Sequence, residues 1–279
     1  MFPILLEIGP LKLHMYGLMI AIGFLIALHF IKRDAKTIGL EPNDVSTMAM
    51  TILFLGIAGT RLFHILMYSE NYSWSDPVGW INVTNGGLVF QGAIPFAFGY
   101  AYFALKKRKI PFWKVPDIAM PYVAIGQGIG RLGCLFNGCC FGVRADQLPW
   151  ALTFPLGSPV QHAHQVHFTD YIDGSPSFPV HPTQIYSALL LCLCGVILLL
   201  LRKYWNPVRG FTLPGYLILT GIYRYIVEMY RGDGNPKELG MGLVTNQQAI
   251  SISFIVVGVL LFIWLMKKQP AGKAEPTPN

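Results

Sequence analysis

The sequence predicts an all-α integral membrane protein with about seven transmembrane helices. Of its 279 residues, 53% are hydrophobic and only 13% are charged, whereas soluble domains carry about 25% charged residues. Apolar stretches long enough to cross a bilayer recur along the chain. The formal net charge of +7 falls mostly in the loops between these stretches. It therefore reports membrane topology and does not indicate a nucleic-acid partner.

Seven apolar stretches account for most of the chain. They cover residues 16–31, 45–68, 88–105, 115–135, 182–201, 213–230 and 245–266. We expect residues 1–268 to form one membrane domain, in which residues 137–181 make a small head segment outside the bilayer. Residues 269–279 are rich in Pro and Lys, which predicts a disordered cytoplasmic tail.

The basic residues indicate the orientation of the chain in the membrane. Alternate loops hold most of them, namely Lys32, Arg33, Lys36, the 106–109 cluster, Lys114, Arg202, Lys203, Arg209, Lys267, Lys268 and Lys273. By the positive-inside rule these loops are cytoplasmic. We therefore expect the N-terminus outside and the C-terminus in the cytoplasm. No internal repeat is apparent, which argues against the inverted-repeat transporters.

Ionisable residues recur near the outer ends of the spans. They are Arg61 and His64 in the second span, Arg131 in the fourth, and Arg224, Glu228 and Arg231 in the sixth. An arginine at membrane depth costs about 2.5–3.5 kcal/mol and suggests a functional site. Arg224 and Glu228 are four residues apart, so they share a helix face and can pair. Two interpretations stay open: structural ion pairs with snorkelling arginines, or guanidiniums that bind a phospholipid headgroup.

The stretch 126–142, GQGIGRLGCLFNGCCFG, ends the fourth span. Residues 128–133 match the dinucleotide fingerprint G-x-G-x-x-G, but that motif has meaning only after a strand. Because an apolar span precedes it here, we interpret the match as accidental. Gly126 and Gly130 form a small-xxx-small pair, which favours close helix packing. Asn137-Gly138 predicts a turn where the chain leaves the helix.

Two groups of residues resemble metal ligands. Cys134, Cys139 and Cys140 have a C-x4-C-C spacing, which is not a standard zinc pattern. A disulfide can form among them on the oxidising outer side. The H-x-H-x2-H pattern at residues 162–167 can bind a metal, although histidines in such a loop are more often simply solvated. Neither pattern by itself predicts a metal site.

These residues together resemble the bacterial prolipoprotein diacylglyceryl transferases. The fourth span carries Gly130-Arg131-x-Gly133-x-x-x-Asn137-Gly138-x-x-x-Gly142, which is similar to that family's signature. Further matches are Tyr16-Gly17, Gly59-x-Arg61, Gly86-Gly87-Leu88, His181-Pro182-Thr183-Gln184-x-Tyr186, Arg224-x-x-x-Glu228-x-x-Arg231-Gly232-Asp233, and Gln247 with Ser251. The resemblance covers nearly the whole chain. It implies a multi-pass protein of the bacterial cytoplasmic (inner) membrane, with its active site facing the outer leaflet.

The resemblance implies transfer of the diacylglyceryl group from phosphatidylglycerol to the lipobox cysteine of prolipoproteins. A thiolate would attack the glycerol carbon next to phosphate, forming a thioether and releasing glycerol 1-phosphate in the first step of lipoprotein maturation. Arg131 and Arg231 correspond to the family's essential arginines and would stabilise the leaving phosphate. Tyr16 and Gln91 complete the expected catalytic set. The resemblance implies no metal and no organic cofactor, and we expect a monomer in the bilayer.

The expected headgroup site is larger than the catalytic set. It comprises Arg131, Arg231, Asn137, Gly142, Arg61, Arg224, Glu228 and Tyr68. Of these, Asn137 and Gly142 match family positions, and we expect them to serve headgroup binding and turn geometry.

The chain departs from the family pattern at several positions. Residues 90–93 read Phe-Gln-Gly-Ala, where well-known members have His, and others Tyr, as the second residue. Gln91 cannot act as a general base, although it can hydrogen-bond a headgroup or hold water. Other departures are Cys134 and Cys139 in place of Asn and Glu, and Ser187 in place of Glu. Either another group (His64, Tyr16 or a phosphate oxygen) takes the thiol proton, or the activity is altered.

Two other classes of function stay open. A diverged paralogue would bind anionic phospholipid or modify another acceptor, without making the thioether product. A small-molecule transporter would use the intramembrane arginines as substrate ligands. It would be expected to show broken helices near the midplane of two related halves, whereas the glycine-rich break here is single and lies at a span end.

Overall fold

The computed structural model describes residues 4–8, 11–72, 80, 89, 92–205, 207–233 and 244–268. These residues fall into two compact units, one made of residues 1–30 with 116–279 and the other of residues 31–115. Gln91 and the expected tail, residues 269–279, lie outside the described residues.

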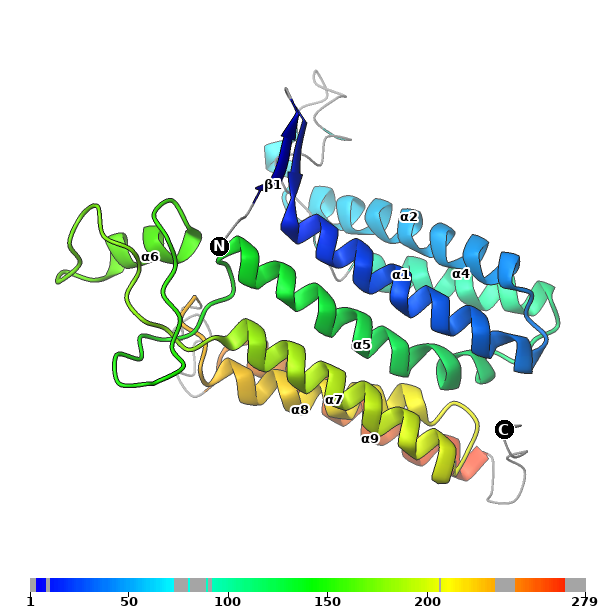
Figure 1. The fold of residues 1–279 in the computed structure, drawn as a ribbon. Coiled ribbons are helices and arrows are strands. Elements are labelled where there is room, and N and C mark those ends of the chain that lie inside the picture. Colours follow the sequence, from blue (N-terminus) through cyan, green and yellow to red (C-terminus); the bar gives the residue numbers. More distant parts are fainter. Residues whose placement is uncertain are drawn as a thin grey trace. The chain divides into compact units, whose positions relative to one another are not determined.

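The described residues are mainly helical (Figure 1). The elements are β1 (Ile4–Ile8), β2 (Leu11–His14), α1 (Met15–Ala35), η1 (Lys36–Ile38), α2 (Pro42–Met67), η2 (Ser69–Asn71), α4 (Ala93–Lys107), α5 (Lys114–Asn137), α6 (Pro159–His167), α7 (Thr183–Tyr204), α8 (Thr212–Glu228) and α9 (Asn246–Lys268). The sequence did not predict the antiparallel β1–β2 hairpin or the short helix α6. The all-α prediction is otherwise confirmed for these residues.

Four of the described helical segments are long and apolar enough to cross a membrane. They are Met15–Ile38, Pro42–Met67, Thr183–Tyr204 and Asn246–Lys268. α4 and α8 have 15 and 17 residues, which is shorter than the about 20 residues of a typical span. α5 has 24 residues but contains Pro121 as well as Arg131. The chain therefore has the helices of a membrane protein, while the count of seven spans stays a prediction.

Small residues bring the helices of the first unit together. A Cβ built on Gly126 of α5 would lie 2.7 Å from the Gly23 carbonyl oxygen of α1. One built on Gly128 would lie 2.8 Å from Cys192 Sγ on α7. This close approach is the use of glycine expected between membrane helices. It confirms the packing interpretation of Gly126. The dinucleotide pattern at 128–133 lies inside the continuous helix α5, so it forms no phosphate loop.

The second unit is held together in a similar way. Gly59 of α2 and Gly92, which precedes α4, face each other so closely that a Cβ on Gly59 would lie 2.4 Å from the Gly92 carbonyl oxygen. At the other end of this pair of helices, Arg108 forms a 2.7 Å ion pair with Asp44.

The segment between α5 and α7 has its own small core. Phe141, Phe154, Val160 and Val180 are buried together there. His164 of α6 is also buried, and its Nδ1 accepts a hydrogen bond from the Phe178 backbone N–H at 3.1 Å. The middle histidine of the H-x-H-x2-H pattern therefore helps to pack the head segment.

Candidate functional site

Arg131 lies on α5, close to the point where that helix ends. Gly138, directly after α5, has φ 68°. Its N–H bonds to the Leu135 carbonyl and the Cys139 N–H bonds to the Cys134 carbonyl, both at 3.2 Å. These are the bonds of a Schellman cap, in which glycine supplies the left-handed residue. The Asn137-Gly138 turn is thus confirmed, and it folds the cysteines back toward the last turn of α5.

A backbone bridge joins the segment after α5 to the segment after α8. Gly142 and Arg231 form an antiparallel bridge, supported by the bonds from Val143 N to Tyr230 O at 2.9 Å and from Gly232 N to Phe141 O at 3.0 Å. The Gly142 N–H also donates to the His181 carbonyl at 3.1 Å. A Cβ on Gly142 would lie 2.5 Å from His181 Cβ and 2.7 Å from the Tyr230 carbonyl oxygen. Only glycine therefore fits where these three segments meet.

Arg231 belongs to a buried ionic cluster. Glu228 Oε2 lies 3.0 Å from Arg224 Nη2 and 3.9 Å from Arg231 Nε. Thr245 Oγ1 donates to the other Glu228 oxygen at 3.2 Å. The Glu228 side chain is only 5% exposed. The predicted i, i+4 pair of Arg224 and Glu228 is therefore confirmed, and it extends to a second arginine.

Asp233 holds Arg231 from the other side. Arg231 Nε and Nη2 donate to the two Asp233 carboxylate oxygens at 2.7 and 2.5 Å. Burial opposes the charge of Arg231, but the bond to Asp233 and the nearby Cys140 and Glu228 raise its pKa above the usual value for arginine. Arg231 is therefore a fixed cation with a defined direction.

Three arginines act on one region of the first unit. Arg131 and Arg231 both exert electrostatic effects on Arg224. Arg131 also interacts electrostatically with the Tyr223 side chain of α8. Within the part of the chain that the structure describes, Arg224 Nη1 is buried and has no hydrogen-bond partner. A buried donor without an acceptor is uncommon, so this cationic region has capacity for an anion.

Cysteine side chains lie beside the same arginines. The neighbouring thiols of Cys134 and Cys139, together with the charges of Arg231 and Arg131, lower the pKa of Cys140 despite its burial. Asn137 is the last residue of α5, two positions before Cys139.

Tyr16, near the start of α1, completes this arrangement. It interacts electrostatically with Arg131 and with the three cysteines at the end of α5. Its backbone carbonyl would lie 3.0 Å from a Cβ on Gly133. The side chain is 43% exposed. Tyr16, Arg131, Asn137, Gly142, Arg224, Glu228 and Arg231 thus all belong to the first unit. There Gly142 pairs with Arg231, and Glu228 forms ion pairs with Arg224 and Arg231.

The remaining predicted site residues lie elsewhere. Arg61 and Tyr68 belong to the second unit. Arg61 Nε donates to the Trp80 carbonyl at 2.9 Å, and its guanidinium lies 5.1 Å from the Tyr72 ring centre. His64 Nδ1 is 2.7 Å from the Tyr72 hydroxyl. Gln91 lies outside the described residues.

The amino-acid sequence matches a known family along almost its whole length. The family model for prolipoprotein diacylglyceryl transferase matches residues 3–264. The chain belongs to the prolipoprotein diacylglyceryl transferase family.

Three relatives illustrate the similarity, and each is named phosphatidylglycerol–prolipoprotein diacylglyceryl transferase. The protein of Photobacterium profundum is 31% identical over 278 residues, covering 96% of this chain and 94% of the relative. That of Synechococcus elongatus is 31% identical over 269 residues, covering 94% and 87%. That of Clostridium tetani is 33% identical over 263 residues, covering 94% and 97%. The chain is therefore a transferase.

In this transferase, the His181-Pro182-Thr183-Gln184-x-Tyr186 motif shapes the loop that carries Cys139 and Cys140. Thr183 Oγ1 donates to the Cys140 carbonyl at 2.7 Å, and Gln184 Nε2 donates to the Cys139 carbonyl at 2.8 Å. Both side chains are almost fully buried. His181 contributes its carbonyl to Gly142, as described above. The sequence contains this motif, but its residue spacing does not predict that Thr183 and Gln184 bond the backbone of the cysteine loop.

Three further residues of the site were not predicted as site residues. Tyr223 interacts electrostatically with Arg131, Thr245 donates a hydrogen bond to Glu228, and Asp233 accepts one from Arg231. Asp233 belongs to the Arg231-Gly232-Asp233 segment that resembles the family, so the sequence contained a signal for it. Ser187, in place of a Glu of some members, donates to the Thr183 carbonyl at 2.7 Å and is buried.

Proposed function

We propose that the chain transfers the diacylglyceryl group of phosphatidylglycerol to the lipobox cysteine thiol of a prolipoprotein. A carbon–sulfur bond forms at the glycerol carbon, the bond from that carbon to the phosphate oxygen breaks, and glycerol 1-phosphate leaves. The names of the relatives supply both substrates. The observation that carries the proposal for this chain is the cluster of three arginines, in which Arg224 Nη1 is buried and has no hydrogen-bond partner among the described residues.

Arg131 and Arg231 can stabilise the negative charge of the leaving glycerol 1-phosphate. As the carbon–oxygen bond breaks, negative charge accumulates on the phosphate, and fixed donors lower the energy of that state. Arg131 and Arg231 act on the same neighbour, Cys140, from α5 and from the segment after α8. Planar guanidiniums bind phosphate oxygens through two parallel bonds. Arg131 and Arg231 would therefore bind the phosphate of the headgroup.

The other residues of the cluster would set the position of these two cations. Glu228 and Asp233 keep Arg231 pointing in one direction, and Glu228 also compensates part of the charge of Arg224. Gly142 determines where the Arg231 backbone runs. Asn137 would hold the turn, and Arg61, Tyr68 and Gln91 remain proposed headgroup or catalytic residues from elsewhere in the chain.

Tyr16 is the proposed residue for handling the thiol proton. Its hydroxyl belongs to the same electrostatic group as Arg131, and it is exposed enough to meet a substrate. The proton of the attacking thiol would pass by way of the Tyr16 hydroxyl to the departing phosphate, so that charge and protons balance without a cofactor.

We further propose the placement of the chain in the membrane. Seven spans within residues 1–268 would put the N-terminus outside, the 137–181 head segment and the arginine site on the outer face of the bacterial inner membrane, and residues 269–279 in the cytoplasm. The protein would work as a monomer. Alkaline phosphatase fused at Gly157 should then be active in cells, whereas a fusion after Lys268 should be inactive. The reverse pattern would refute this topology.

Mass spectrometry tests the proposed reaction. Purified protein is incubated with phosphatidylglycerol and a lipobox peptide, and the peptide should gain one diacylglyceryl group as glycerol 1-phosphate appears in equal amount. The same peptide with Ser in place of its Cys should gain nothing. A folded protein that binds phosphatidylglycerol without making the thioether would refute the transfer and favour the lipid-binding paralogue.

A further inference from the structure

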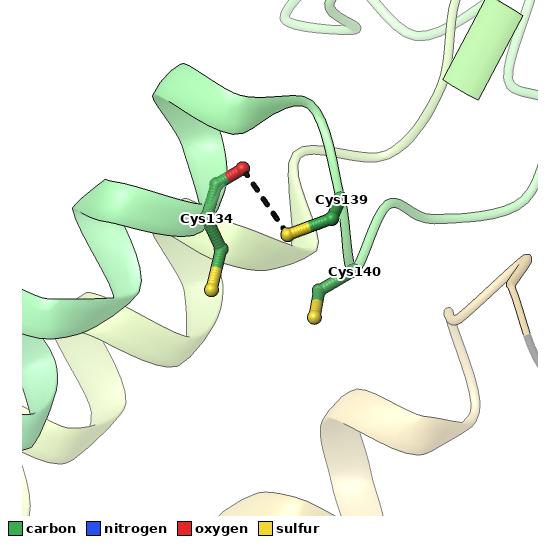
Figure 2. A group of neighbouring side chains, drawn as sticks. All are labelled: Cys134, Cys139 and Cys140. Atoms are coloured by element: carbon green, nitrogen blue, oxygen red, sulfur yellow. Dashed lines mark hydrogen bonds between the residues drawn. The ribbon is translucent and has the colours of Figure 1, made fainter. Parts of the chain in front are cut away.

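Three thiols converge where α5 ends. The Sγ atoms of Cys134, Cys139 and Cys140 all lie within 4.8 Å of one another. Figure 2 shows Cys134 on the last turns of the helix and the other two on the loop that folds back beside it. Cys139 Sγ points to the Cys134 carbonyl at 3.9 Å. The C-x4-C-C spacing, which resembles no standard metal pattern in the sequence, thus becomes a cluster in the fold.

The backbone of this cluster is fixed from several sides. The Cys139 N–H is bonded to the Cys134 carbonyl, and Gln184 and Thr183 hold the carbonyls of Cys139 and Cys140. Cys140 has φ 58°, a left-handed conformation that is uncommon for residues other than glycine. Such a conformation costs energy and persists where the surroundings enforce it. The thiols are therefore preorganised.

A disulfide explains this geometry less well than a shared ligand does. A disulfide joins two of the thiols and leaves the third without a role. Three thiolates around one ion, with metal–sulfur bonds of about 2.3 Å in a trigonal plane, place the sulfurs about 4.0 Å apart. Separations within 4.8 Å therefore need only small side-chain rotations to reach that arrangement.

We propose that Cys134, Cys139 and Cys140 form a three-thiolate site for a soft monovalent cation, Cu⁺. Thiolates without imidazole or carboxylate partners favour Cu⁺, whereas Zn²⁺ requires a fourth ligand. Within the described residues, the ligand group contains three sulfur atoms and no fourth side chain. Three thiolates and one Cu⁺ carry a net negative charge. The nearby positive charges of Arg131 and Arg231, which act on Cys140, offset it.

This site has a consequence for the proposed transfer. Cys140 lies in the field of the two arginines proposed to bind phosphate. A bound Cu⁺–thiolate group would therefore compete for their charge and lower transfer. Cu⁺ binding is measured without the transfer reaction. The binding result therefore holds even if the proposed transfer is refuted.

The test measures Cu⁺ binding to the full-length protein in detergent. The reduced, anaerobic protein competes for Cu⁺ with the chromophoric chelator bicinchoninate. The parent should hold one Cu⁺. Each of Cys134→Ser, Cys139→Ser and Cys140→Ser should weaken binding at least about tenfold, and the triple variant should hold none. Cys192→Ser serves as the matched control, because Cys192 lies on α7 outside the cluster, and it should bind as the parent does.

Three results would overturn the proposal. The first is Cu⁺ retention by the parent no greater than by the triple variant. The second is Zn²⁺ retained in preference to Cu⁺ when both are offered. The third is a Cys134–Cys139 or Cys134–Cys140 disulfide found by mass spectrometry in protein isolated without reductant. Circular dichroism of every variant shows whether its helices remain folded, so a loss of binding is attributable to the missing thiol.

Discussion

Gly142 and Arg231 are paired in an antiparallel backbone bridge, although they follow different helices, α5 and α8. The bridge places the Arg231 guanidinium near Cys140, on the same loop as Gly142. Arg131 reaches this loop from the last turns of α5. The backbone pairing thus assembles two arginines that are far apart in the sequence into one cationic region.

Gly142→Ala should damage this region specifically. The added methyl group would lie 2.5 Å from His181 Cβ and 2.6 Å from the His181 carbonyl oxygen, so the three segments must separate. Forced overpacking costs about 1–3 kcal/mol, and Arg231 would shift with its backbone. We expect a lower melting temperature and transfer activity reduced at least about tenfold. Gly99→Ala is the control, because a Cβ there has no neighbour within 4 Å, and it should behave as the parent does.

Glu228→Gln should destabilise the protein and reduce activity. Glu228 is almost fully buried between Arg224 and Arg231, and removing its charge leaves two buried cations facing each other. Breaking a buried ion pair in this way costs on the order of 3 kcal/mol. Thermal denaturation measures the loss. Asp170→Asn removes an exposed partner of Arg144 and should change nothing measurable. Equal stability of the two variants would contradict the structural role given to Glu228.

Thr183→Val should weaken the cysteine loop without altering side-chain size. The hydroxyl is buried, and its 2.7 Å bond satisfies the carbonyl of the left-handed Cys140. Leaving that carbonyl unpaired costs about 1–3 kcal/mol, and Cu⁺ binding should weaken together with stability. In Thr47→Val, the lost hydroxyl bond is exposed on α2, so stability should hardly change. A Thr183→Val protein as stable as Thr47→Val would argue against this role.

The head segment should become less stable in mild acid. Burial, the positive charge of Arg144 and the neighbouring His167 lower the pKa of His164 below its ordinary value of 6.5. The unfolded chain therefore binds a proton more readily than the folded one, so this contribution to stability is complete above about pH 6.5 and declines as the pH falls below it. Melting temperatures measured between about pH 5 and 8 should show the decline, and His164→Phe should reduce it. His162→Gln, at an exposed position of α6, should keep the parent's pH dependence. A decline of the same size in His164→Phe would assign it to another group.

The sequence predicts the relations that local spacing governs. Arg224 and Glu228 pair because residues four apart share a helix face. Asn137 and Gly138 end α5 because glycine accepts the left-handed cap. Gly126 packs closely because it has no side chain. Each of these relations lies within one helix or depends on a small residue that allows close packing.

The relations that were missed depend on the path of the chain in three dimensions. No spacing rule connects Gly142 with Arg231, or Thr183 with the carbonyl of Cys140. The C-x4-C-C spacing does not predict the cysteine cluster, because it matches no standard zinc pattern. The cap at Gly138 instead folds Cys139 and Cys140 back to Cys134. The β1–β2 hairpin is not predicted, because strands of five and four residues are too short to give an apolar span.

If Arg131 and Arg231 together hold the phosphate of phosphatidylglycerol, the initial rate of transfer should depend on both. The rate is measured with saturating lipobox peptide at several concentrations of phosphatidylglycerol, for the parent, Arg131→Ala, Arg231→Ala and, as a control, the exposed Arg33→Ala. Losing one fixed donor to a developing anion lowers a rate about 10²–10³-fold. We therefore predict losses of that size in both site variants, with Arg33→Ala close to the parent. A folded Arg131→Ala or Arg231→Ala protein that transfers at nearly the parent's rate would contradict the account.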